Sequence, residues 1–305
     1  MSEPTANSPA TPASVPAPVK TASPAATGPV PAPAITTAAP AAPAPALPVK
    51  FTAKPMRVGV FPFLNIQPLI WEMKNHHHLM DAPPNQMGRL LKEGKLDVAI
   101  APIAAYLKDP SLQIVPVAAI GCKGPVKSVR LLGNAPWPTV TRLFADSRSE
   151  TSVLLARLIL KKWYGVKKLE VQHVDMATYK PNQTKPWEAV LQFGDIALES
   201  APGGMTVMDL GEEWFIRTQK PFIFAVWMAR NVPLAREIEM DLLACKTEGL
   251  KHIQEIVDQY HGIWVFHKPQ AREYLEKNID YKYTAVEVQG QLEFGKLLKE
   301  EGLIL

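Results

Sequence analysis

A polar side chain, Asn65, stands in a turn between an expected strand and an expected helix. Arg57–Val60 alternates and is rich in β-branched residues, which predicts a buried strand. Proline in the first turn of residues 67–71 is typical of a helix start. Ligands of open α/β sheets bind at the carboxyl ends of the strands, so the turn makes Asn65 a candidate ligand contact. The alternative is that Asn65 only caps the helix.

A second candidate, Ser128, follows a loop at residues 121–125 that contains two glycines and a proline. It lies at the start of an expected strand over residues 126–132. Its hydroxyl can donate a hydrogen bond to a bound carboxylate. The alternative is that the hydroxyl satisfies the loop's own backbone.

A cluster of hydroxyl side chains precedes an expected helix over residues 153–163: Ser147, Ser149, Thr151 and Ser152. The free backbone N–H groups and the dipole of a helix start favour an anion. A carboxylate bound there needs no metal. The spacings Ser147-x-x-Glu150 and Ser149-x-x-Ser152 also fit helix capping, and a cap and an anion site use the same geometry.

A glycine and an aspartate, Gly194 and Asp195, follow an expected helix over residues 187–193 and precede an expected strand. Glycine at such a junction allows a ligand to approach the backbone closely. The pair is equally consistent with a plain turn.

The elements that must position these residues alternate in the manner of an α/β protein. Strands are expected at residues 96–102 and 113–120, with short helices at 84–93 and 103–107. This rhythm predicts a parallel sheet with right-handed crossovers. Residues 221–228 are almost wholly apolar, which predicts a strand buried on both faces. From residue 233 to the end the pattern is helical, and we expect these helices to pack on the first sheet.

The order of elements predicts a two-lobed α/β protein with a ligand cleft between the lobes. The first lobe is expected over residues 55–135 and 220–305, and the second over 136–219. This layout matches the type II periplasmic-binding-protein-like fold, in which hinge closure around a ligand excludes water.

Composition sets the N-terminal residues 1–54 apart as a Pro/Ala-rich tail. The first fifty residues hold thirteen of the thirty prolines and only three charged side chains, so they offer no face to bury and are expected to be disordered. They also lack the pattern of a secretory signal. The other residues carry a net charge of +3 out of +4, which gives no reason to expect nucleic acid or a membrane surface as a partner.

Cysteine and histidine usage does not predict a metal site. Cys122 and Cys245 have no metal-type spacing, and reduced thiols in the cytoplasm are expected. The run His76 to His78 places its side chains about 100° apart on a helix, which is unsuitable for joint ligation. A solvated helix end is the expected role of the three histidines.

Six segments together resemble the chorismate dehydratase family of the menaquinone pathway. They occur in the family's order and spacing: FLNIQPL at 63–69, GKLDVA at 94–99, GPVKS at 124–128, TSV at 151–153, GDIAL at 194–198, and LG at 210–211 leading to PFIFAVW at 221–227. The similarity extends from Met56 to Arg230, and the helical residues beyond it are compatible with the family.

The resemblance implies a lyase with no metal and no organic cofactor. Such enzymes of the futalosine route eliminate water from chorismate and form 3-[(1-carboxyvinyl)oxy]benzoate. Asn65 and Ser128 would hold and aim the enolpyruvyl carboxylate, which acts as the base. The hydroxyl cluster at residues 147–152 would grip a carboxylate, and Gly194 and Asp195 match a motif that lines the cleft. Chorismate is then the expected partner of the protein, and its expected location is the cytoplasm.

One departure from the family concerns Glu150, where the family commonly has arginine. Arg148 lies two positions earlier and is a candidate for the missing positive charge. Two other functions fit the same layout. One is the sister lyase that releases dihydroxynaphthoate, although its characteristic turn differs from residues 64–68. The other is a non-catalytic binding protein for a small carboxylate.

Overall fold

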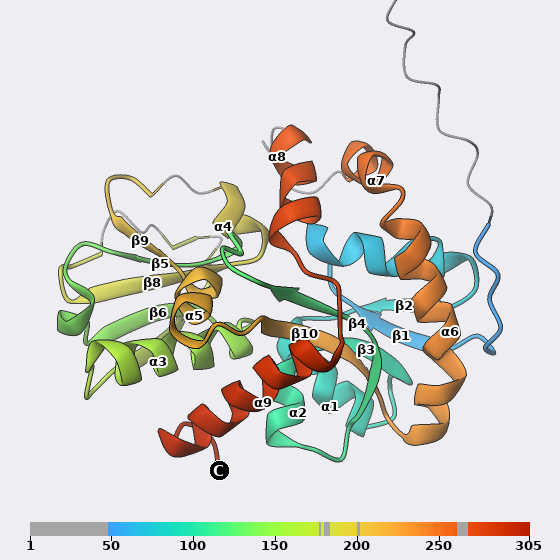
Figure 1. Ribbon diagram of the computed structural model, residues 1–305, viewed down its shortest axis with the longest axis horizontal. Coiled ribbons are helices and arrows are strands. Elements are labelled where there is room, and N and C mark those ends of the chain that lie inside the picture. The colour runs from blue at the N-terminus through green and yellow to red at the C-terminus, as the bar shows by residue number, and fades with distance from the viewer. Residues whose placement is uncertain (1–47, 177, 180–183, 200–201, 261–267) are drawn as a thin grey trace, which may run out of the picture. The chain divides into compact units, whose positions relative to one another are not determined.

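Two five-stranded sheets organise the part of the chain that this computed structural model describes, residues 48–176, 178–179, 184–199, 202–260 and 268–305 (Figure 1). In order across the first sheet lie β2 (His78–Asp81), β1 (Arg57–Val60), β3 (Val98–Pro102), β10 (Phe222–Ala229) and β4 (Gln113–Cys122). In order across the second lie β7 (Glu170–Val174), β6 (Arg142–Asp146), β8 (Glu188–Phe193), β5 (Val129–Gly133) and β9 (Thr206–Asp209). Residues 46–305 form one compact unit.

The first sheet is mixed because of the return strand β10. The strands β1, β3 and β4 run parallel to one another, as predicted, since β3 and β4 are both antiparallel to β10. β1 pairs in parallel with β2 and β3, whereas β10 runs antiparallel between β3 and β4. β10 comes back from the second sheet, and its direction follows from that return rather than from a βαβ crossover. Every residue of β10 is buried, as its apolar sequence predicted.

The second sheet begins earlier in the chain than expected. β5 pairs antiparallel with β8 and β9, so the chain crosses between sheets after β4 and before Val129. The expected boundary at residue 135 is therefore corrected to the loop that carries Ser128. β6 pairs in parallel with β7 and β8.

One expected helix is a strand. Residues 187–193 contain good helix formers, which led to the prediction of a helix. In the structure Glu188–Phe193 is β8, hydrogen-bonded to β5 on one side and β6 on the other. Tertiary pairing outweighs local propensity here. The junction at Gly194 consequently runs from strand to helix and not from helix to strand.

The helices cover both sheets and end in a C-terminal group (Figure 1). The helices that precede β10 in the chain are η1 (Leu64–Ile70), η2 (Met73–Asn75), η3 (Pro84–Gln86), α1 (Met87–Lys92), α2 (Ile103–Lys108), η4 (Trp137–Thr139), α3 (Glu150–Tyr164), α4 (Asp195–Glu199) and α5 (Leu210–Thr218). The C-terminal group consists of α6 (Val232–Gly249), α7 (Ile253–Gln259), α8 (Lys268–Glu273), the π-helical turn η6 (Tyr274–Asn278) and α9 (Ala285–Glu300). α6 packs against β4 and η1, as expected, but α9 contacts α3 as well as β10 and thus reaches both lobes.

The tail expected over residues 1–54 is only partly within the described residues. Residues 1–47 lie outside them. Residues 49–53, however, are held against the protein, because the backbone N–H of Val49 donates to Glu72 and those of Thr52 and Ala53 donate to Asp241. The end of the expected tail therefore belongs to the folded unit.

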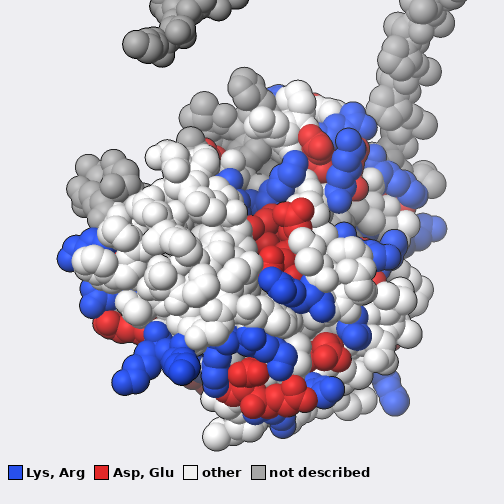
Figure 2. Space-filling view, turned by 60° about the vertical axis from the view of Figure 1, so that its left-hand side comes forward, with Lys and Arg blue, Asp and Glu red and all other residues white. Residues whose placement is uncertain are grey.

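The hydropathy of the described helices bears on a membrane span, and the charges on one face of the surface bear on charged partners. Among the described residues, no helix combines the length and the hydropathy needed to cross a membrane. On the face shown in Figure 2, basic and acidic side chains lie next to one another beside a broad uncharged area.

Candidate active site

A cavity between the two sheets gathers most of the predicted site residues. It encloses about 550 Å³ of empty space, part of it open to solvent. Its walls are largely apolar and include Phe61, Phe63, Phe193 and Phe224. The polar side chains that line it include Asn65, Ser128, Ser149, Thr151 and Ser152.

Asn65 lies within η1, directly after the end of β1, and does not cap that helix. The N-cap residue of η1 is Phe63, and no side chain caps the helix start. Asn65 Nδ2 donates to the hydroxyl of Tyr274 at 3.1 Å. Its Oδ1 is buried and has no hydrogen-bond partner. The capping alternative is therefore wrong for Asn65, which instead offers a free acceptor.

Ser128 lies in the crossover between the sheets, and its hydroxyl does not serve the loop's own backbone. Its Oγ accepts a hydrogen bond of 2.9 Å from Tyr274. Asn65, Tyr274 and Ser128 thus form one continuous hydrogen-bonded set, which we call the Tyr274 bridge. The sequence does not point to Tyr274, because Tyr274 lies in a C-terminal helical segment with only a packing pattern.

A second missed residue, Asp209, holds the crossover loop in place. Its carboxylate accepts from the backbone N–H groups of Val126 at 3.1 Å and Lys127 at 2.6 Å, and it caps the start of α5. Gly211 in that first turn leaves room for the loop, since a Cβ there would lie 2.5 Å from Cys122 Sγ. This packing gives the Leu210-Gly211 pair a role in holding the Ser128 loop, although the pair does not line the cavity.

The hydroxyl cluster divides between the cavity and the surface. Ser149, Thr151 and Ser152 line the cavity at the start of α3. Ser149 is the N-cap residue of α3, but its hydroxyl donates to Asp146 O at 2.7 Å instead of accepting from the helix start. Thr151 Oγ1 accepts from the backbone N–H of Ala104 in the first lobe at 3.2 Å. Ser147 is exposed and does not line the cavity, so the structure does not bring it together with the others.

The two charged residues of this stretch face different partners. Arg148 lines the cavity, forms two hydrogen bonds to Asp146 at 2.9 and 2.6 Å, and lies 5.9 Å from the centre of the Phe193 ring. Glu150 is paired with Lys108 of the first lobe. Its charge is therefore balanced across the lobes, and Arg148 is the cation that the cavity presents.

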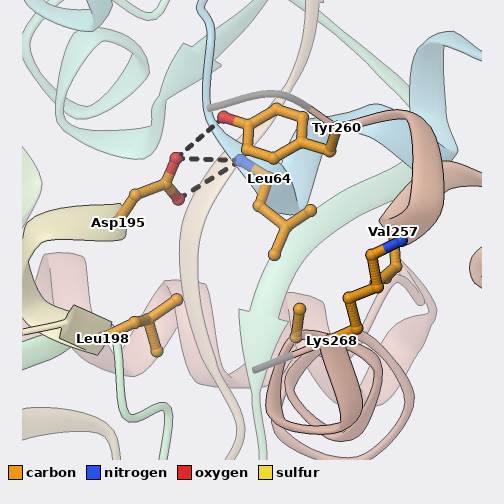
Figure 3. A pocket seen from close by; sticks show the side chains of 7 residues that line it. Leu64, Asp195, Leu198, Val257, Tyr260 and Lys268 are labelled. Carbon is orange, nitrogen blue, oxygen red and sulfur yellow. Dashed lines mark hydrogen bonds between the residues drawn. The ribbon is translucent and has the colours of Figure 1, made fainter. Parts of the chain in front are cut away.

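Gly194 lines the cavity, whereas its neighbour Asp195 lies outside it. Gly194 has a φ of +64°, and a Cβ at this position would come within 3.3 Å of the Phe63 ring. The carboxylate of Asp195 accepts from Leu64 N at 3.2 and 3.1 Å and from the Tyr260 hydroxyl at 3.0 Å (Figure 3). Burial raises the pKa of Asp195 to about 7. Asp195 thus joins the second lobe to the start of η1.

The expected solvated helix end is wrong for His77, whereas His78 is exposed at the start of β2. His77 is buried, and its Nε2 lies 3.1 Å from Asp241 Oδ2 while its Nδ1 accepts from the Met56 N–H. His76 Nε2 lies 2.6 Å from Ala53 O. The ligand atoms of His76, His77 and Asp241 lie within 4.8 Å of one another, but each already has a protein partner.

The sequence as a whole matches a known family. A sequence profile described as menaquinone biosynthesis covers residues 56–300, most of the chain. The chain belongs to the menaquinone biosynthesis family. Chorismate dehydratase of Thermus thermophilus is 27% identical to this family member over 231 residues, which is 67% of this chain and 81% of the relative.

Solved structures share the fold of this menaquinone biosynthesis protein. They include a protein of Archaeoglobus fulgidus (TM-score 0.69, 14% identity, 82% of this chain and 98% of that chain). They also include the periplasmic aliphatic sulphonate binding protein of Escherichia coli (TM-score 0.59, 16% identity, 82% of this chain and 94% of that chain). At these identities the likeness concerns the fold alone. It confirms the predicted two-lobed α/β fold of the periplasmic-binding-protein type.

Proposed function

We propose that this protein is a chorismate dehydratase, a hydro-lyase that eliminates water from chorismate to give 3-[(1-carboxyvinyl)oxy]benzoate. The observation that carries the proposal is the cavity itself. It places an amide and a hydroxyl on one side, hydroxyls and a helix start on the other, and Arg148 beside them. The family membership and the relative from Thermus thermophilus support the same reaction.

The reaction removes a proton from one ring carbon and hydroxide from its neighbour, and the electron pair of the C–H bond becomes part of the aromatic ring. Because aromatisation makes the step strongly downhill, the reaction needs orientation and a proton acceptor rather than a strong electrophile. Among the described residues that line the cavity, the ionisable side chains are Arg148 and Glu150, and both are in ion pairs. This arrangement favours the substrate's own enolpyruvyl carboxylate as the proton acceptor.

Each side of the cavity then has a separate task. Asn65, through the second hydrogen of Nδ2, and Ser128, through its hydroxyl hydrogen, hold the enolpyruvyl carboxylate at the carbon-bound proton. Such a near-attack geometry supplies much of the rate enhancement. The second carboxylate lies at the start of α3, where the first-turn N–H groups have no intrahelical acceptors. Ser149, Thr151 and Ser152 surround that position, and Arg148 adds a positive charge.

The place of the reaction in metabolism follows from the same assignment. Within menaquinone biosynthesis, loss of water from chorismate is the step that opens the futalosine route, and we assign this protein to it. A soluble intermediate such as chorismate is available in the cytoplasm, which we propose as the location of the protein.

The decisive experiment is incubation of the purified protein with chorismate, followed by mass detection of the product. We expect a product lighter than chorismate by one water. Unchanged chorismate that is nevertheless bound tightly would favour a binding protein, the class to which the sulphonate-binding neighbour belongs. Turnover of a cyclised futalosine derivative instead would favour the sister lyase.

A further inference from the structure

A buried tyrosine that does not line the cavity holds together two side chains that do. Tyr274 is 1% exposed, and its hydroxyl lies 3.1 Å from Asn65 Nδ2 and 2.9 Å from Ser128 Oγ. These partners lie 209 and 146 residues away in the chain. The Tyr274 bridge therefore depends on three distant segments meeting at one oxygen atom.

The donors and acceptors of the Tyr274 bridge fix its direction. An amide nitrogen only donates, so the tyrosine oxygen accepts from Asn65 Nδ2, and its single hydrogen goes to Ser128 Oγ. Ser128 keeps its own hydrogen for another acceptor, and Asn65 Oδ1 has no partner. The serine hydrogen is therefore available to a ligand carboxylate in the cavity that Asn65 and Ser128 line, whereas Asn65 Oδ1 can pair only with a ligand group that donates, such as a hydroxyl.

The opposite direction would remove a donor from the cavity. If the phenol donated to the amide oxygen, its own oxygen would accept from Ser128, and the serine hydrogen would be used inside the protein. An ionised carboxylate only accepts hydrogen bonds. A substrate carboxylate beside Ser128 therefore needs the direction that the structure shows.

The segment that carries Tyr274 is anchored to the loop that carries Ser128. Asn278 Nδ2 donates to Pro125 O at 3.0 Å, and Asp280 exchanges backbone hydrogen bonds of 2.8 and 3.0 Å with Gly121. Tyr274 itself begins a π-helical turn, a rare conformation that is frequent at functional sites. Burial also raises the pKa of the Tyr274 phenol far above its ordinary value, so the phenol keeps its hydrogen.

We propose that Tyr274 is a positioning residue of the dehydratase, which orients Ser128 so that the serine hydroxyl donates to the reacting carboxylate of the substrate. This inference rests on the proposed function. Tyr274 does not touch the substrate and acts through Ser128. Its loss should consequently lower the turnover rate more than substrate affinity.

The first test is Tyr274→Phe, which removes the hydroxyl and keeps the ring. We expect kcat to fall by about tenfold with KM changed by less than about twofold. Tyr281→Phe is the matched control, because Tyr281 is also buried and its hydroxyl donates to the backbone O of Asn65 at 2.9 Å. The control should lower Tm by a similar amount and leave kcat within about twofold. Equal kcat losses in the two variants would overturn the inference.

The second test separates a positioning role from a structural one by a double-mutant cycle. If Tyr274 acts through Ser128, the double variant Ser128→Ala with Tyr274→Phe should be no slower than Ser128→Ala alone. Rate losses that multiply would show that the two residues act independently, which would overturn the proposal.

The wild-type protein distinguishes failure of this inference from failure of the proposed function. If the wild-type protein does not convert chorismate, the proposed function fails. The double-mutant cycle of Ser128 and Tyr274 is then measured as the Kd for chorismate by calorimetry. Coupled losses of affinity would support the positioning role, and independent losses would overturn it. If wild-type protein does not bind chorismate either, both proposals fail.

Discussion

Two buried polar clusters of this protein differ in whether every polar atom has a partner. In the Asp241 cluster, formed by Thr52, Ala53, His77 and Asp241, the carboxylate accepts four hydrogen bonds. In the Tyr274 bridge, Asn65 Oδ1 is buried with no partner at all. A buried polar group without a hydrogen bond costs free energy and requires an explanation.

The difference assigns the two clusters to different tasks. The Asp241 cluster closes on itself and fixes residues 52 and 53 against α6, so it stabilises the fold. The Tyr274 bridge leaves an acceptor and a hydroxyl hydrogen at a cavity, where a ligand can complete them. Substitutions in the first cluster should therefore change stability, and substitutions in the second should change turnover.

The largest expected effect belongs to Asp241→Ala. It leaves the N–H groups of Thr52 and Ala53 and the His77 ring without their acceptor, at a cost of about 4 kcal/mol in the free energy of unfolding. Urea denaturation measures this loss, and kcat per folded molecule should not change. Asp258→Ala is the control, because it removes an exposed carboxylate paired with Lys268 and should barely move the midpoint. A loss of turnover without a loss of stability would reverse the assignment.

The next effect concerns Asp195, a buried carboxylate that joins the two lobes. Its pKa is raised to about 7 by burial and by the charge of Glu199, against the opposing hydrogen bonds from Tyr260 and Leu64. The folded state therefore binds this proton more tightly than the unfolded state, so the contribution of Asp195 to stability is largest at low pH and is lost as pH rises towards 7. Between pH 5 and 7 this amounts to about 2 kcal/mol.

Unfolding measured at several pH values tests this contribution. Asp195→Asn keeps the shape and removes the titration, so the slope between pH 5 and 7 should flatten relative to the wild-type protein. Glu199→Gln is the companion variant, since it removes only the neighbouring charge and should weaken the slope slightly. An unchanged slope in Asp195→Asn would show that Asp195 does not titrate in this range.

A smaller effect on the free energy of unfolding is expected for a substitution of Asn65. Asn65→Ala should lower kcat by about tenfold or more, because small misplacements of the reacting carboxylate are costly. The free energy of unfolding should change by about 1 kcal/mol or less, since the amide makes one side-chain hydrogen bond. Steady-state kinetics corrected for the folded fraction separates the two quantities. Stability lost with turnover retained would place Asn65 with the Asp241 cluster.

The sequence predicted the parts of the site that belong to strand ends and helix starts. Asn65, Ser128, Ser149 and Gly194 were found because each sits in a turn next to a regular element, and such turns have local signatures. The two-lobed fold followed from the order of the elements in the same way. These features depend on neighbours in sequence, which a single chain reveals.

The features that the sequence did not predict depend on contacts between residues that lie far apart in the sequence. Tyr274 reaches the site across 209 residues, and nothing in its own helical pattern indicates that contact. Residues 188–193 form a strand because β5 and β6 flank them, although their side chains favour a helix. His77 is buried because Asp241 lies 164 residues away in α6 and accepts its hydrogen bond.

The smallest expected effect is that of metal on the Asp241 cluster. A metal ion would have to displace the hydrogen bonds that His76, His77 and Asp241 already make, and His77 would lose its contacts to both Met56 and Asp241. Added zinc should consequently leave Tm unchanged, and a chelator should change neither Tm nor turnover of chorismate. A zinc-dependent rise of Tm that His76→Ala abolishes would show that the cluster is open to a ligand. The contrast with the Tyr274 bridge would then no longer hold, because both clusters would have a vacant partner position.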